Sequence, residues 1–67
     1  MNKELKELKK EIEGLKGSTV YSLWGPSVVD GVELDGDKLN VFLLENGNEP
    51  YFVEVRNRED WQNNLNG

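Results

Sequence analysis

The sequence predicts an α+β domain, with an N-terminal helix packed on a three- to four-stranded antiparallel meander and a short C-terminal helix. Three patterns support this prediction. The first part carries apolar side chains at helical spacing, the middle alternates apolar and polar side chains around two glycine turns, and the end regains helical spacing. With 67 residues the chain suits one small domain, which we place over residues 1–67.

The N-terminal helix is expected over residues 2–15. Its apolar side chains recur three or four positions apart, on one helical face: Leu5, Leu8, Ile12 and Leu15. Gly17 is suited to end the helix, because glycine readily adopts the left-handed conformation found at helix C-termini. The apolar stripe, extended to Met1, also fits a dimeric coiled coil. Because it spans barely two heptads, we expect it to cover the chain's own sheet.

Four segments rich in β-branched and aromatic residues are expected to form strands: about 19–24, 28–34, 39–45 and 50–56. Gly25-Pro26 is expected to break the chain between the first two strands. Asp35-Gly36 and Asn46-Gly47 are strong hairpin signals, since tight hairpin turns need residues that adopt positive φ. The second, third and fourth strands should therefore form a meander, which the first strand can extend.

The C-terminal helix is expected over residues 58–65. Asn57 can cap its first turn, and Trp61 and Leu65 lie four residues apart on one face. Trp61 and the N-terminal apolar stripe should cover one face of the sheet. Alternate residues of the strand 39–45 should lie beneath them.

Charge is unevenly distributed along the chain. Residues 1–17 hold five lysines and four glutamates, a net charge of +1, whereas residues 18–67 hold nine acids and three bases, a net charge of −6. These sum to the −5 of the whole chain. An acidic body is a poor surface for nucleic acid, because binding phosphates requires lysine and arginine. It suits a partner with a basic surface.

The absence of cysteine and histidine excludes several kinds of chemistry. Without them the chain has no thiol nucleophile, no disulfide, no zinc–thiolate site and no histidine base. We expect no cofactor and no metal site. No apolar run approaches the length of a membrane span, and the charged N-terminus is unlike a signal peptide, so we expect a soluble, cytoplasmic protein.

Asp35 and Asp37 are the strongest candidates for chemistry. As a calcium loop the segment fails by its fifth position, where Leu39 supplies no oxygen. The first two-thirds of the chain also resemble a minimal nucleotidyltransferase, in which a helix, a strand and a Gly-Ser turn precede two alternating aspartates that bind magnesium. Here Gly25-Pro26 replaces Gly-Ser, and Leu39 stands where the second aspartate would fall. We therefore expect both aspartates to be solvated turn residues.

Other catalytic arrangements are equally incomplete. The serines have no histidine as a partner, and the only lysine of the acidic body lies in a turn, at Lys38. The carboxylate pairs lie in a chain too short to form a sugar-binding cleft. We therefore expect that the protein is not an enzyme.

A non-enzymatic protein-binding module is the function that the sequence favours. The residues expected to contact a basic protein partner are six acids and one aromatic residue: Asp30, Glu33, Asp35, Asp37, Glu45, Glu49 and Tyr51. In size and charge the chain is similar to small phage-encoded inhibitors such as anti-CRISPR proteins and glycosylase inhibitors. That similarity implies a nucleic-acid mimic that blocks a nucleic-acid-binding protein. We expect a monomer, because the N-terminal stripe is used internally. The alternative is a structural or oligomerising domain that uses the N-terminal stripe.

Exposed aromatic side chains offer a second kind of binding surface, because tyrosine and tryptophan carry much of the energy of protein interfaces. The candidates are Tyr21, Trp24, Tyr51 and Phe52. Tyr51 and Phe52 are adjacent on a strand and should point to opposite faces of the sheet, so that one of them should be exposed.

Overall fold

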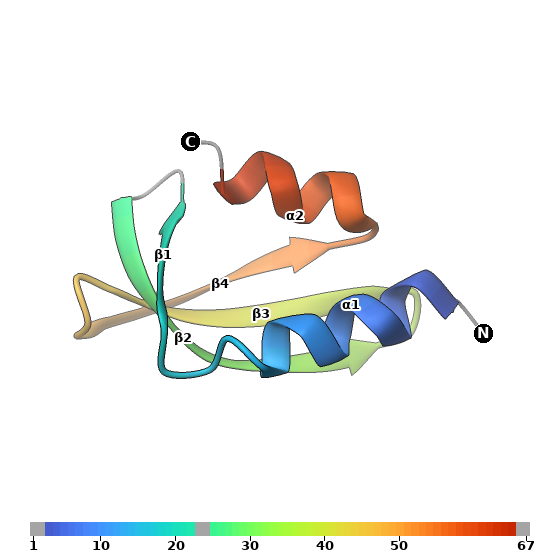
Figure 1. The fold of residues 1–67 in the computed structure, drawn as a ribbon, viewed down its shortest axis with the longest axis horizontal. Helices are drawn as coiled ribbons and strands as arrows, with labels where there is room; N and C mark the ends of the chain where they lie inside the picture. Colours follow the sequence, from blue (N-terminus) through green and yellow to red (C-terminus); the bar gives the residue numbers. More distant parts are fainter. Residues whose placement is uncertain (1–2, 23–24, 66–67) are drawn as a thin grey trace.

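A computed structural model describes residues 3–22 and 25–65 and confirms the expected α+β architecture (Figure 1). The elements in chain order are α1 (Lys3–Glu13), β1 (Thr19–Ser22), β2 (Gly25–Asp35), β3 (Lys38–Glu45), β4 (Glu49–Val55) and α2 (Arg58–Leu65). Four antiparallel strands form one sheet in the order β1-β2-β3-β4. Leu23 and Trp24, which we expected at the end of the first strand, lie outside the described residues.

The sheet is curled rather than flat. Figure 1 shows β1 and the first part of β2 turning sharply away from the direction of β3 and β4. The register between β2 and β3 shifts between Val29 and Gly31, so that Asp30 is an extra residue on β2. A β-bulge of this kind bends its strand and increases the local twist.

The expected break at Gly25-Pro26 is wrong, because β2 begins at Gly25, three residues earlier than expected. Gly25 has a φ of 98°, which lets the chain turn back and pair immediately with β1. Pro26 lies opposite Tyr21, next to the turn. Proline is tolerated at such a position because one missing N–H group costs the ladder little there.

The two expected hairpins form, and the first turn comprises residues 35–38 as expected. Asp35 pairs with Lys38, so the loop consists of Gly36 and Asp37, and only Gly36 has a positive φ, of 63°. Positive φ at the first loop residue alone is characteristic of a type II′ turn. Asp35 therefore ends β2 and is also the first of the four residues of the turn.

The hydrophobic core lies between the helices and one face of the sheet, which we call the inner face. Its buried side chains come from both helices and three strands: Leu5, Leu8, Ile12, Val29, Leu39, Val41, Leu43, Val55 and Trp61. The odd-numbered residues of β3 are thus the buried ones, beneath the N-terminal stripe and Trp61 as expected. Leu5, Leu8 and Ile12 of the stripe are thus buried against the chain's own sheet.

The end of α1 and the start of α2 lie at the residues that the sequence indicates. After α1 the chain turns at Gly17, whose φ is 87° and whose N–H donates to the Val29 carbonyl at 2.8 Å. At the start of α2, the Asn57 side chain accepts a hydrogen bond from the Asp60 N–H at 2.8 Å. The expected cap is therefore present. Within the described residues, neither helix has the length and apolar character needed to cross a membrane.

Candidate functional site: the outer face of the sheet

Strand β3 is apolar on both of its faces. Leu39, Val41 and Leu43 are buried on the inner face, whereas Phe42 and Leu44 alternate with them and point to the opposite side, which we call the outer face. Strands with two apolar faces are typical of sheets that are covered on both sides. Here α1 and α2 both pack against the inner face, through core residues of that face alone.

The outer face has an aromatic centre, formed by Val28, Phe42, Leu44 and Phe52. Phe42 lies directly opposite Phe52 on β4, with ring centroids 6.1 Å apart and ring planes at 44°. Val28 lies opposite Leu44 on the other side of β3. Despite its aromatic neighbour, Phe52 remains 56% exposed.

Gly31 leaves an open space beside this centre. The bulge at Asp30 places Gly31 opposite Phe42, where a side chain would otherwise cover one flank of the ring. A Cβ atom added at Gly31 would meet nothing within 4 Å, and the φ of Gly31 is not in the left-handed region. The position thus has room that an inserted side chain from another molecule could occupy.

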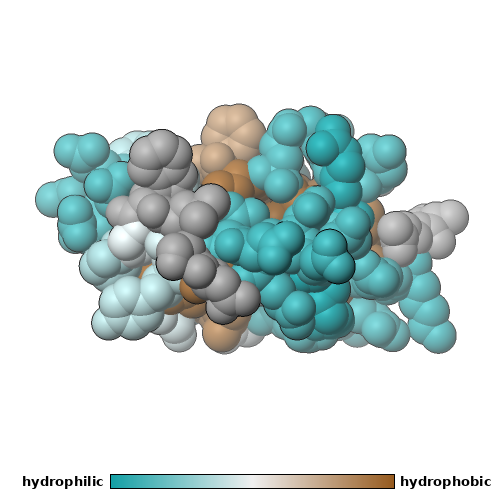
Figure 2. Space-filling model, turned by 90° about the horizontal axis from the view of Figure 1, so that it is seen from above, coloured by the Kyte–Doolittle hydropathy of each residue, from teal (hydrophilic) through white to brown (hydrophobic). Residues whose placement is uncertain are grey.

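The apolar surface extends onto β1. Tyr21 lies opposite Pro26, both on the outer face by the register of β1 and β2, and Tyr21 is 70% exposed. From the side of α2, Figure 2 shows a mainly hydrophilic surface over the helix, with hydrophobic atoms emerging at the upper margin of the view. Apolar surface is therefore not confined to the interior.

Acidic side chains gather at the end of the outer face near the β2–β3 turn. Glu33 and Glu54 flank Asn40 on its two neighbouring strands, and Asp35 follows beside Lys38. Lys38 forms an ion pair with Glu54, and this hydrogen bond from the ammonium group lowers the pKa of the Glu54 carboxyl. The aspartates and Glu33 are exposed, so this end of the sheet is negative.

The six acids predicted to form the site are not brought together in one cluster. Glu45 and Glu49 face each other beside the β3–β4 turn, at the opposite end of the sheet. At about 3.3 Å per residue, the length of β3 separates the two ends by roughly 23 Å. Asp30 lies between them at the bulge. The structure thus has two acidic ends with the aromatic centre between them.

Tyr51, the aromatic residue selected from the sequence, belongs to the inner face. It lies opposite Leu43 and is half-buried against the core. Its hydroxyl forms hydrogen bonds of 2.7 Å with the hydroxyls of Ser22 and Ser27, both of which are buried. The expectation that Tyr51 and Phe52 point to opposite faces is correct, and Phe52 is the exposed one.

The sequence reasoning missed Phe42, Leu44 and Gly31 as surface residues. A usable signal was present in the run Val41-Phe42-Leu43-Leu44, which is apolar at odd and even positions alike. A strand that is apolar on both faces is typical of a sheet that is covered on both sides. The two helical segments of this chain cover only one side. The signal did not identify which parity would remain uncovered.

The spacing of the carboxylates determines whether the site could hold a metal ion. Among residues 3–22 and 25–65, no three carboxylates lie close enough to hold a metal ion. Its described features define a small α+β domain with one covered and one uncovered sheet face. Comparison with known proteins finds no matching family model, no matching curated protein and no matching solved structure.

Proposed function

We propose that this protein is a non-enzymatic binding module whose outer face holds an amphipathic basic segment of a protein partner. The observation that carries this proposal is the two-faced apolar strand β3, covered by helices on one face only. The exposed Phe52 and the half-buried Phe42, with the open space of Gly31 beside it, offer the kind of contact that a partner's apolar side chains require. These apolar side chains remain in contact with water after folding. Their burial at an interface would therefore contribute favourable free energy to binding.

The charge distribution supports a basic partner. Acidic side chains stand at both ends of the aromatic centre, so a segment lying along β3 would place lysine or arginine residues at each end. Complementary charges of this kind steer association and fix the orientation of the partner. The finer proposal is that the acids stand in for phosphates, and that the partner is a nucleic-acid-binding protein that the module inhibits.

The test uses a synthetic amphipathic peptide of lysine and leucine as the probe. Titrated into isotopically labelled protein, it should shift the amide NMR signals of β2, β3 and β4. Phe52→Ser should weaken binding about tenfold, as truncation of a central aromatic contact does. Gly31→Leu should also weaken it, by filling the open space without straining the backbone.

Leu34→Ser is the matched control, because Leu34 is an exposed apolar residue on β2 that faces away from the aromatic centre. It should leave the affinity for the peptide nearly unchanged. Equal losses from Phe52→Ser and Leu34→Ser, or shifts confined to α1, would show that the outer face is not the binding surface.

A further inference from the structure

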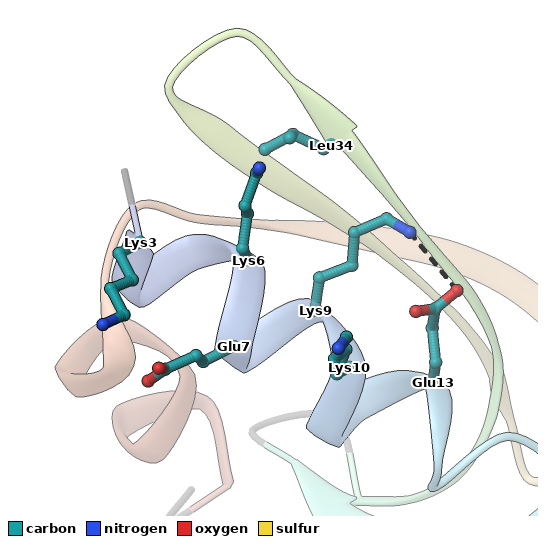
Figure 3. A pocket seen from close by; sticks show the side chains of 7 residues that line it. All are labelled: Lys3, Lys6, Glu7, Lys9, Lys10, Glu13 and Leu34. Carbon is teal, nitrogen blue, oxygen red and sulfur yellow. Dashed lines mark hydrogen bonds and ion pairs between the residues drawn. The ribbon is translucent and has the colours of Figure 1, made fainter. Parts of the chain in front are cut away.

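A second surface of opposite charge lies between α1 and the end of β2 (Figure 3). It is an open groove of about 580 Å³ lined by seven residues: Lys3, Lys6, Glu7, Lys9, Lys10, Glu13 and Leu34. Four lysines and two glutamates give this lining a net charge of +2, in a chain whose net charge is −5. The groove therefore stands out electrostatically from the rest of the molecule.

The lysines dominate the groove because the other acids of α1 are engaged elsewhere. Glu11 accepts two hydrogen bonds from the Arg58 guanidinium, at 2.8 and 2.6 Å, and Glu4 accepts one from the Arg58 backbone N–H at 3.0 Å. Both carboxylates are thus directed toward α2. Positive and negative charges are nearly balanced along the sequence of α1. In the folded chain, Glu4 and Glu11 face α2, whereas the lysines line the groove.

Most of the lysine charge in the groove is unpaired. Lys9 forms an ion pair with Glu13 at 3.2 Å, but within the described part of the chain Lys3, Lys6 and Lys10 form no ion pair. Figure 3 shows the side chain of Lys6 extending across the groove toward Leu34. Leu34 itself is 37% exposed, so the groove offers an apolar contact beside several ammonium groups.

We propose that this groove binds a short acidic peptide segment of a protein partner. Carboxylates of the segment would pair with Lys3, Lys6 and Lys10, and an apolar side chain would rest on Leu34. A peptide fits better than nucleic acid, because Glu7 and Glu13 also line the groove and would repel a continuous phosphate backbone. The site shares no residue with the aromatic centre and stands independently of the function proposed for the outer face.

The experiment is an NMR titration of the labelled wild-type chain with a synthetic glutamate-rich peptide that contains one leucine. We expect saturable shifts at the amides of α1 and at Leu34, with no shifts around Phe52. Lys6→Glu should weaken binding about tenfold or more, since it replaces an attraction by a repulsion. Lys16→Glu makes the same charge change just beyond α1 and outside the groove, so it should weaken binding less than about threefold.

Circular dichroism is used to check that both variants fold. If the charge reversal unfolds the domain, Lys6→Gln is used in place of Lys6→Glu. Equal losses from Lys6→Glu and Lys16→Glu would overturn the proposal, because they would indicate general charge attraction only. Shifts that do not saturate, or that inorganic phosphate reproduces, would overturn it as well. Tighter binding of a single-stranded oligonucleotide of equal charge would assign the groove to nucleic acid instead.

Discussion

Arg58 connects the two helices through both its side chain and its backbone. Its guanidinium donates two hydrogen bonds to Glu11, and its backbone N–H donates to Glu4. The hydrogen bond from Arg58, reinforced by its positive charge, lowers the pKa of the Glu11 carboxyl. The planar guanidinium matches a carboxylate in this paired geometry, which lysine cannot reproduce.

This contact predicts a pH-dependent effect of Arg58→Gln. Because the folded-state pKa of Glu11 is lowered, its contribution to stability is present above the ordinary glutamate pKa of about 4.3 and is lost as the pH falls through the folded-state value. The variant should melt slightly below wild type at pH 7, as expected for an exposed ion pair, and this difference in melting temperature should narrow toward pH 3. Thermal melts at both pH values measure it.

Lys16→Gln serves as the control, since it removes one positive charge without removing an ion pair described in the structure. Its difference from wild type should be small and should not depend on pH in this way. A gap for Arg58→Gln that stays constant from pH 7 to pH 3 would show that the ion pair with Glu11 does not contribute to stability.

At the scale of elements, α1 covers the inner face together with α2. Its three buried residues, Leu5, Leu8 and Ile12, are at most 1% exposed. A helix of 11 residues is marginal in isolation, so its stability comes from this packing rather than from its sequence alone. Strand β3 shows the complementary case, because its outer apolar face has no such cover.

Leu8→Ala should therefore destabilise the monomer by about 2–5 kcal/mol, the usual cost of truncating a buried leucine. Chemical denaturation measures this loss, with Lys10→Ala as a control at an exposed position of the same helix, where about 0.5 kcal/mol or less is expected. Sedimentation of the wild type should give the monomer mass of 7.7 kDa. A dimer mass that is lost together with helicity in Leu8→Ala would favour the coiled-coil alternative instead.

At the scale of the whole molecule, the fold places positive and negative side chains on separate surfaces. The molecule is elongated, with extents of 34 × 19 × 17 Å. The groove beside α1 is positive, and both ends of the sheet are negative. Charged partners should therefore bind in defined orientations, with association rates that depend on salt.

Reversing the acids at both ends tests this arrangement. The triple variant Asp35→Lys, Asp37→Lys, Glu49→Lys should bind the basic peptide more weakly, mainly through slower association, because steering is lost. Stability should change by about 0.5 kcal/mol or less for each substitution, since all three side chains are exposed. Association rates at two salt concentrations measure the effect.

Wild-type rates should fall as salt rises, because screening shortens to about 8 Å at physiological ionic strength and further above it. If the module mimics nucleic acid, its partner should also release it in competition with DNA or RNA. Rates that respond neither to salt nor to the triple reversal would show that the acids only keep the protein in solution.

Local features were predictable because they depend on neighbouring residues. The apolar stripe of α1, the left-handed Gly17, the Asn57 cap and the two glycine hairpins follow from spacing and from backbone preferences that act within a few positions. The predicted break at Gly25-Pro26 was wrong because a contact with another strand decided the local structure there. Pairing with β1 overrode the local preference of the dipeptide for a break.

The sequence by itself determined the α+β class and the order of the elements, but it left open which parity of β3 enters the core. Only the tertiary structure decided which surfaces are formed. Arg58 reaches Glu11 across 47 positions, the bulge at Asp30 moves Gly31 beside Phe42, and Lys6 meets Leu34 at a groove. These contacts join residues far apart in the chain or depend on a shift of register. Patterns read over a few residues contain no information about either.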